Sequence, residues 1–286
     1  MSGTNIVPMT NALPAAAAGT WQLGDLTVNR LGFGAMRVKD RASAVAVLRR
    51  AVELGVNHID TAAFYFLPTL SANELINHAL SPYPDDLVIA TKVGPGRDPS
   101  GAFLPEAEPG QLRGQVEENL RQLGRDHLDL VYLRVGAGLE KGAGSIAERF
   151  GVLSELRDEG LIRNLGISNV DADHLTEAGK IAPVVSVQNQ YSLAKRDDDG
   201  LLDICAGDGI AFVPFFSIDG VRDRPGAAAV ADERGVSLQQ MALAWSLARS
   251  PNVLAIPGTG DPAHLEQNVA AAALRLTGEE MARAAG

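Results

Sequence analysis

The sequence contains a single cysteine, Cys205, and this scarcity excludes two kinds of stabilisation. One cysteine cannot form an intramolecular disulfide, and it cannot supply the several thiolates of a multi-cysteine zinc site. Its neighbours in LLDICAGDGIAF are mostly apolar, so we expect Cys205 to be a small core residue rather than a nucleophile. The five histidines are scattered without the spacing of metal ligands, and we expect no metal site.

Long hydrophobic runs are also missing. No segment approaches the roughly 18 apolar residues of a membrane-spanning helix. The N-terminus has an Ala-rich stretch but lacks the basic segment and long apolar segment of a signal peptide. We therefore expect a cytoplasmic protein in which residues 1 to about 19 form a mobile leader.

Positive charge is scarce as well, because 25 Lys and Arg face 35 Asp and Glu, for a net charge of -10. An acidic surface argues against nucleic acid or an anionic membrane as the main partner. It still permits a local basic pocket for an anionic ligand. No exposed apolar stripe requires a dimer, so we expect a monomer or a weak homo-oligomer.

What the sequence does contain is a regular alternation of short apolar runs and amphipathic segments after the leader. Runs such as LVIAT, LDLVYL and AFVPF are typical of strands covered on both faces, as in a parallel sheet. We expect eight strands: Arg30–Gly34, Asn57–Asp60, Leu87–Lys92, Leu128–Arg134, Asn164–Ser168, Val184–Gln188, Ala211–Phe215 and Val253–Ile256. Helical spacing occurs in Ser43–Leu54, Gln111–Leu123, Ile146–Glu159, Asp171–Gly179, Leu238–Arg249, Ala263–Ala273 and the C-terminal LTGEEMARAA.

Eight strands alternating with helices predict an α/β fold, a (β/α)8 TIM barrel formed by residues 20–286 as one domain. WQLGDLTVNRLGFG, with its Gly24-Asp25 turn, predicts an N-terminal β-hairpin before the first barrel strand. Asp171 and Ser237 are expected helix N-caps, and Gly55, Gly124 and Gly160 are expected helix ends. A doubly wound dinucleotide fold is disfavoured, because Gly32-Phe-Gly34-Ala-Met-Arg37 lacks the third glycine of its fingerprint.

Active groups of barrel enzymes project from the carboxyl ends of the strands. Three such ends supply Asp60 with Tyr65, Lys92, and Arg134. A phenol is a weak acid, and a nearby ammonium favours its ionised form, while a carboxylate would hold that ammonium in place. Each residue alone has an ordinary alternative: a loop cap for Asp60, packing for Tyr65, a solvated strand end for Lys92. Together they predict a site in which Tyr65 protonates a carbonyl oxygen, Lys92 assists its proton loss and Asp60 anchors Lys92.

The order DTA with Tyr65, then TK at Lys92, LGISNV, VQNQYS, and IPGT with LEQN resembles the aldo-keto reductase superfamily from about Leu23 to the C-terminus. This resemblance implies a (β/α)8 barrel, a small-molecule carbonyl substrate, and NADPH as cofactor, with NADH possible because the adenosine end is atypical. Its catalytic set maps to Asp60, Tyr65 and Lys92. It implies these cofactor-binding residues: Gly34, Ala35, Met36, Ser168, Asn169, Gln188, Phe215, Phe216, Ser217, Ile218, Gly220, Ile256, Gly258, Thr259, Gly260, His264, Gln267 and Asn268.

Arg134 stands where the superfamily has its catalytic histidine, five residues after Asp129. Arginine stays protonated near neutral pH, so it could donate hydrogen bonds to a substrate oxygen but could not act as a neutral imidazole. The same exchange is similar to a bacterial branch that contains pyridoxal reductase, which implies reduction of pyridoxal to pyridoxine.

Two alternatives stay open. Phe66–Leu70 departs from the Tyr-Gly-Pro of that branch, and Val93–Gly110 is irregular, so the chain could be a specialised reductase of a secondary metabolite. It could also be a non-catalytic, NADPH-binding regulatory subunit, although Asp60, Tyr65 and Lys92 argue against lost catalysis.

Overall fold

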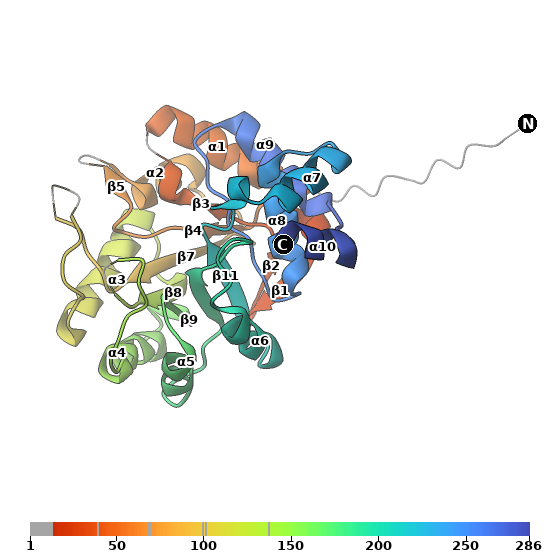
Figure 1. Cartoon of the computed structure of the whole chain (residues 1–286). Coiled ribbons are helices and arrows are strands. Elements are labelled where there is room, and N and C mark those ends of the chain that lie inside the picture. Colours follow the sequence, from red (N-terminus) through yellow and green to blue (C-terminus); the bar gives the residue numbers. More distant parts are fainter. Residues whose placement is uncertain (1–13, 39, 68–69, 99, 101, 137) are drawn as a thin grey trace, which may run out of the picture.

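The computed structural model describes residues 14–38, 40–67, 70–98, 100, 102–136 and 138–286. Its core is a parallel sheet of seven strands in the order β11-β10-β9-β8-β7-β4-β3, which curls into a barrel surrounded by helices (Figure 1). In chain order these strands are β3 (Phe33–Gly34), β4 (His58–Asp60), β7 (Val88–Val93), β8 (Leu128–Arg134), β9 (Ile162–Ser168), β10 (Ser186–Gln190) and β11 (Ala211–Phe215).

The eighth predicted strand, Val253–Ile256, closes the ring between β11 and β3. It is present as two parallel bridges, Phe212 with Val253 and Leu31 with Ala255, rather than as a continuous ladder. Leu254 N–H donates to Phe212 O at 2.9 Å, and Ala255 N–H donates to Arg30 O at 2.9 Å. Both edges of the sheet are thus joined, and the predicted (β/α)8 barrel is confirmed.

The strand β8 shows why these segments read as continuous apolar runs. All seven of its residues are buried. Leu130 and Tyr132 pack in the barrel interior, whereas Val131 and Leu133 pack in the layer between sheet and helices. Because side chains alternate between the two faces and both faces are covered, no polar position is left in the middle of the strand.

Ten α-helices are described, and most cover the outside of the barrel (Figure 1). The predicted caps are confirmed: the Asp171 and Ser237 side chains accept hydrogen bonds from the first turns of α5 and α8. Gly55, Gly124 and Gly160 have φ of 88°, 63° and 86° at helix ends, where a left-handed conformation favours glycine. The bounds are α1 (Arg41–Glu53), α2 (Ala72–Leu80), α3 (Pro109–Leu123), α4 (Ala147–Asp158), α5 (Ala172–Gly179), α6 (Asp199–Gly207), α7 (Pro225–Arg234), α8 (Leu238–Arg249), α9 (Pro262–Ala270) and α10 (Gly278–Ala285).

The predicted hairpin is formed by β1 (Thr20–Leu23) and β2 (Leu26–Asn29). Leu23 and Val28 are fully buried among the interior side chains of the barrel strands. At the turn, the Asp25 carboxylate pairs with Arg163 at the amino end of β9, at 2.8 Å. The hairpin therefore covers the amino ends of the strands and leaves their carboxyl ends as the open mouth.

The expectation of a mobile leader to about residue 19 is wrong for its last part. Pro14–Ala18 form a 3₁₀-helix, and Ala15 is fully buried with its N–H bonded to Leu54 O at 3.0 Å. Small alanines let this helix lie close against the barrel, so the Ala-rich composition indicates packing rather than mobility. Residues 1–13 lie outside the described part of the chain.

A short pair of strands follows the loop of Tyr65. β5 (Phe66–Leu67) and β6 (Leu70–Ser71) pair antiparallel in the stretch after Tyr65; residues 68–69 lie outside the described part.

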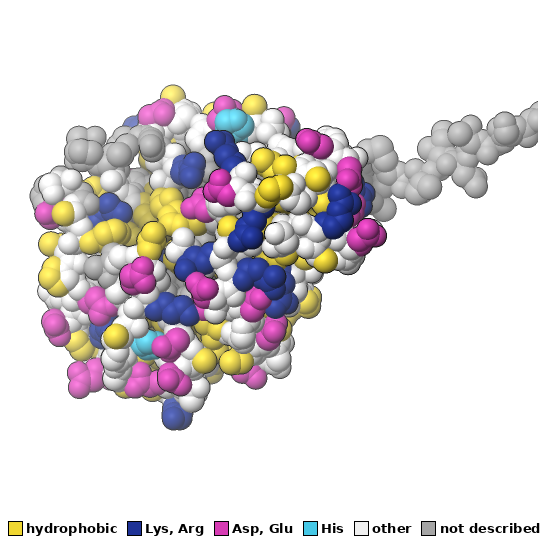
Figure 2. Space-filling view, viewed as in Figure 1, with side chains coloured by type: hydrophobic (Ala, Val, Ile, Leu, Met, Phe, Trp, Pro, Cys, Tyr) yellow, Lys and Arg dark blue, Asp and Glu magenta, His cyan; other side chains and the backbone are white. Residues whose placement is uncertain are grey.

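Figure 2 shows Lys and Arg interspersed with Asp and Glu over the viewed face. None of the helices described is long and apolar enough to cross a membrane.

His58 is a buried ionisable group in the barrel wall, on β4 two residues before Asp60. Its side chain is fully buried, and neither ring nitrogen has a hydrogen-bond partner among the described residues. Burial lowers the pKa of His58 from 6.5 to about 4, with Lys92 adding to this effect and Asp60 opposing it. The folded state therefore favours the neutral ring.

We expect the burial of His58 to lower the free energy of unfolding in acid, because the unfolded chain binds the proton more readily than the folded one. The stability that comes from the neutral ring is fully present above about pH 6.5 and is lost as pH falls toward 4, by roughly 1.4 kcal/mol per pH unit. Urea unfolding at several pH values should show a shallower loss for His58→Leu than for the wild type. The exposed-histidine variant His264→Gln should keep the wild-type slope, and equal slopes in all three proteins would contradict the assignment.

Gly94, just after β7, lies against the backbone at the end of β8. Its φ is 118°, and an added Cβ would lie 2.3 Å from Arg134 O. We expect Gly94→Ala to lower the free energy of unfolding by about 2 kcal/mol or more, because both the strain and the clash oppose folding. Gly114→Ala is the matched control, since open space surrounds that helical glycine and alanine should be neutral or stabilising there. Chemical denaturation measures both, and similar values for the two variants would contradict this account.

Candidate active site

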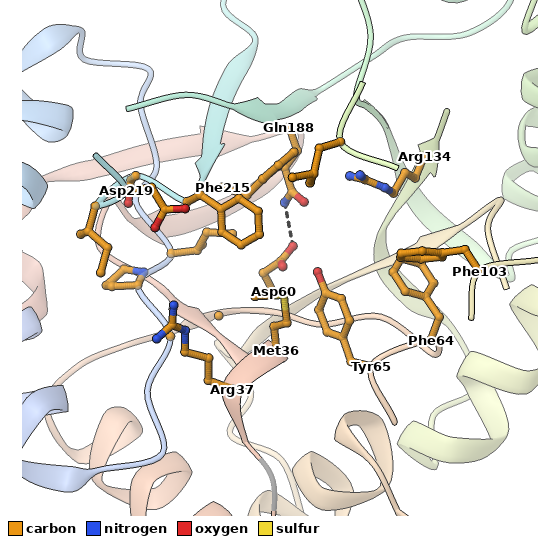
Figure 3. Close-up of a pocket in the computed structure, with 18 of the residues that line it drawn as sticks. Met36, Arg37, Asp60, Phe64, Tyr65, Phe103, Arg134, Gln188, Phe215 and Asp219 are labelled. Carbon is orange, nitrogen blue, oxygen red and sulfur yellow. Dashed lines mark hydrogen bonds between the residues drawn. The ribbon is translucent and has the colours of Figure 1, made fainter. Parts of the chain in front are cut away.

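Four polar side chains converge at the open mouth of the barrel from the carboxyl ends of neighbouring strands. Asp60 ends β4, Lys92 lies in β7, Arg134 ends β8 and Gln188 lies in β10. The strands run parallel in register, which pairs Arg134 with Ser168 and Ser168 with Gln188. Figure 3 shows Asp60, Arg134 and Gln188 around one pocket together with Tyr65.

Lys92 and Asp60 form a buried ion pair. Lys92 Nζ donates to Asp60 Oδ1 at 2.6 Å and to Thr61 O at 2.9 Å, and the two side chains are 2% and 4% exposed. The second carboxylate oxygen, Asp60 Oδ2, accepts from Gln188 Nε2 at 2.7 Å (Figure 3). A buried charge is tolerated when it is paired and hydrogen-bonded in this way. The predicted union of Asp60 and Lys92 is present in the structure.

Tyr65 stands beside this pair on the loop after β4. Lys92 Nζ lies 4.9 Å from the centre of its ring. Phe64 contacts the ring edge-on, with centroids 5.2 Å apart. In Figure 3 the Tyr65 hydroxyl points into the pocket, on the side where Asp60 lies. The three residues that sequence reasoning grouped are therefore brought together.

A buried polar network fixes the loop that accepts from Lys92. Thr61 Oγ1 donates to Asn73 Oδ1 at 2.8 Å, and Asn73 Nδ2 donates to Asn119 Oδ1 at 2.8 Å. Thr91 Oγ1 donates to the same Asn119 oxygen at 2.6 Å. These contacts tie α2 and α3 to the residues on either side of the ion pair. Sequence reasoning missed this network, because it joins residues far apart in the chain.

Arg134 occupies the remaining wall of the pocket. It is 7% exposed, its Nη2 donates to Gly138 O at 2.6 Å, and its guanidinium carbon lies 5.2 Å from the Phe215 ring centre. Burial lowers the pKa of Arg134, an effect that the nearby Tyr65 and Asp60 oppose. A guanidinium remains protonated at neutral pH, so the pocket keeps a fixed cation where an imidazole could have been neutral.

The residues predicted to bind the cofactor fall into two groups. One group lines the pocket around the catalytic set, and the other lies outside it. The lining members are Gly34, Met36, Gln188, Phe215, Phe216, Ser217, Ile218, Ile256 and Gly258. The others are Ala35, Ser168, Asn169, Gly220, Thr259, Gly260, His264, Gln267 and Asn268.

Ser168 lies beside the lining residue Gln188, with which it pairs between β9 and β10, and Gly34 and Gly258 line the pocket themselves. Ser168 Oγ is buried and has no hydrogen-bond partner among the described residues, so a donor or acceptor is free there. A Cβ on Gly34 would lie 2.6 Å from Ile256 O, and one on Gly258 would lie 2.4 Å from Gly34 O, so neither position has room for a side chain. Asn169 departs from expectation, because its Nδ2 already donates to Val135 O at 2.8 Å and to Glu140 O.

The predicted adenosine end is built on the loop before α9 and its first turns. Thr259 and Asn268 are nearly buried, whereas the His264 side chain is 66% exposed. Arg275 donates to the carbonyls of Ala17, Ala272 and Leu274 and so ties the N-terminal 3₁₀-helix to the barrel.

Sequence reasoning missed part of the pocket wall. Phe64, Arg97, Phe103 and Leu139 line it, and so does Arg37 beyond Met36. Phe103 and Arg97 lie within Val93–Gly110, the segment whose irregular sequence left a specialised reductase open. Nothing in the sequence indicated that Leu139 would turn back to the same opening, because that depends on the path of the loop after β8.

Comparisons with known proteins agree with this geometry. Residues 17–224 and 221–286 match the model of the aldo/keto reductase family. Pyridoxine 4-dehydrogenase of Escherichia coli is 46% identical over 276 residues, which cover 92% of this chain and 96% of that protein. An uncharacterised oxidoreductase of Schizosaccharomyces pombe is 40% identical over 287 residues, covering 96% and 91% of the two chains.

The solved structure of an aldo-keto reductase from Klebsiella pneumoniae in complex with NADPH has a TM-score of 0.77 at 28% identity, and 90% of each chain is covered. The barrel, its mouth of strand-end side chains and the family match lead to one conclusion. The chain belongs to the aldo/keto reductase family.

Proposed function

We propose that this protein is an NADPH-dependent reductase of aldehydes, with pyridoxal as its substrate. The observation that carries the proposal is the buried Lys92–Asp60 pair beside Tyr65, at the mouth of the barrel. The similarity to pyridoxine 4-dehydrogenase of Escherichia coli supports pyridoxal and pyridoxine as the carbonyl and alcohol. The similarity to a structure in complex with NADPH supports the cofactor, with NADH as the alternative. We propose cytoplasm as its setting.

The residues present fit the cofactor: the backbone of Gly34 and Gly258 lines the pocket, and beside Gln188 the buried Ser168 Oγ has no partner among the described residues, so these groups would hold it. Phe215 and the loop through Ser217 and Ile218 would cover it. When bound, NADPH supplies the hydride that reduces the carbonyl carbon.

Residues of the protein transfer the proton. Tyr65 donates its hydroxyl proton to the carbonyl oxygen as the carbon is reduced, and the resulting phenolate lies beside the Lys92 ammonium, which stabilises it. Asp60 fixes the position of that ammonium, and Gln188 fixes the position of the Asp60 carboxylate. Solvent returns the proton to Tyr65 after the alcohol leaves. Phe64, Phe103 and Leu139 form an apolar rim that limits water at the reacting atoms.

Replacing the proton donor separates this proposal from a non-catalytic, NADPH-binding role. We expect Tyr65→Phe to bind NADPH as the wild type does, measured by fluorescence titration, while pyridoxal turnover falls by at least about 100-fold. Tyr83→Phe is the matched control, because Tyr83 Oη bonds to Leu123 O outside the pocket, and its turnover should stay near that of the wild type. Unchanged turnover in Tyr65→Phe would remove Tyr65 as the donor.

The substrate proposal is tested by initial rates with pyridoxal and a panel of aromatic aldehydes, using NADPH and NADH separately. Consumption of NADPH with pyridoxal above the blank supports it. If no aldehyde consumes either cofactor, the reductase function itself is wrong. A panel member that is turned over while pyridoxal is not would favour the specialised reductase.

A further inference from the structure

The Arg134 guanidinium is a buried cation without a counter-charge. It is 7% exposed and lines the pocket, and Gly138 O is its single protein acceptor in the described part of the chain. No carboxylate of the described residues lies within 4.0 Å of its nitrogens. Asp60, the acid at the same end of the pocket, is already bonded to Lys92 and Gln188. Asp60, Lys92 and Arg134 together carry one excess positive charge.

An uncompensated buried charge is costly, and a guanidinium offers five N–H donors of which the structure uses one here. The remaining donors that face the cavity can be satisfied by a ligand. In Figure 3 the Arg134 guanidinium and the Tyr65 hydroxyl both point into the same space, so one molecule can contact both. An anionic oxygen on that molecule would supply the missing counter-charge.

The walls around this space are flat and apolar. Phe64 and Phe103 lie edge to face with ring centres 6.2 Å apart, and Phe215 forms the wall on the side of Arg134. Phe103 and Leu139 are 40% and 52% exposed at the rim, where they offer an apolar surface to an entering ring. These contacts favour an aromatic ring over a flexible polar chain such as a sugar.

We propose that the pocket selects aromatic aldehydes that carry an ionised hydroxyl on the ring position next to the aldehyde, and that Arg134 binds this oxyanion. The inference rests on the reductase function proposed above and deepens it, since pyridoxal is one member of the class. With the aldehyde oxygen at Tyr65, a neighbouring ring oxygen faces the adjacent wall of the pocket, where Arg134 stands.

The same cation would also assist the reaction. As the carbonyl carbon is reduced, negative charge grows on its oxygen beside the ring oxyanion, and two like charges so close oppose each other. A fixed guanidinium next to both oxygens lowers this repulsion. A neutral imidazole at the same place would not, and this is a chemical reason for arginine at this position.

A matched set of substrates tests the inference. The rates of reduction of 3-hydroxypyridine-4-carboxaldehyde, 3-methoxypyridine-4-carboxaldehyde and pyridine-4-carboxaldehyde by the NADPH-loaded wild type are compared as kcat/KM. We expect the 3-hydroxy compound to exceed the other two by at least about tenfold, the scale of a hydrogen bond between charged groups. Equal kcat/KM for all three would overturn the inference and leave the reductase function standing. No reduction of any aldehyde, pyridoxal included, would instead overturn the function.

Variants of Arg134 test whether this residue causes the preference for the 3-hydroxy compound. We expect Arg134→Gln to lose at least about tenfold more in kcat/KM for the 3-hydroxy compound than for the 3-methoxy compound. Arg134→Lys should keep part of the preference, because it keeps the charge. Arg163→Gln is the control: Arg163 pairs with Asp25 at the amino end of β9, outside the pocket, and the ratio between the two compounds should stay as in the wild type. A preference that survives in Arg134→Gln would overturn the assignment.

Binding of the alcohol products gives a readout that does not depend on turnover. Calorimetry with the NADP⁺-loaded protein should show tighter binding of 3-hydroxy-4-(hydroxymethyl)pyridine than of its 3-methoxy analogue. This difference should disappear in Arg134→Gln. NADPH fluorescence reports whether each variant is folded, so a variant that fails to bind the cofactor is replaced by Arg134→Met in the same comparison. Equal affinities of the wild type for both alcohols would contradict the proposal.

Discussion

The arrangement of side chains at the mouth of this barrel depends on one buried lysine ammonium, because a charge away from water needs an opposite charge and hydrogen bonds. Lys92 is 2% exposed, and its charge is balanced by Asp60 at 2.6 Å and by the carbonyl of Thr61. Gln188 takes the other carboxylate oxygen, so neither oxygen of Asp60 lacks a donor. Each partner comes from a different strand or loop, and the closed barrel is what brings them together. Removing Asp60 would leave the ammonium buried and unpaired, and removing Gln188 would leave one carboxylate oxygen without its donor.

Further buried hydrogen bonds hold the residues next to this ion pair in place. The Asn73 and Asn119 side chains join α2 and α3 to Thr61 and Thr91, next to the two ends of the ion pair. Arg134 receives no such compensation, and burial lowers the pKa of its guanidinium. The protein thus balances one buried cation with its own groups, whereas we propose that a ligand balances the second. Under this proposal one site combines a preorganised ion pair with selectivity for a charged substrate.

Much of the fold could be predicted from the sequence. Apolar runs such as LDLVYL are covered on both faces, and β8 and β11 have the predicted bounds. The helices α2, α6 and α7 were not predicted, although α2 carries a local signal, the capping box of Ser71 and Glu74. The segment Pro14–Ala18 was taken for a mobile leader, since nothing local shows that its alanines pack on the barrel. The eighth strand is reduced to two bridges, a detail set by the strands on either side.

The sequence by itself determined the barrel, the hairpin at its base, and the candidates Asp60, Tyr65, Lys92 and Arg134. The repeats of apolar residues that indicate strands and helices lie within short stretches of the chain, and the positions at the strand ends follow from them. Only the tertiary structure decided which of these groups are paired and which lack a partner among the described residues. Ser168 has a free buried hydroxyl, Asn169 is occupied by its own loop, and Arg134 lacks a carboxylate in the part of the chain described. These outcomes depend on loops that meet from distant parts of the chain, and no local pattern encodes such meetings.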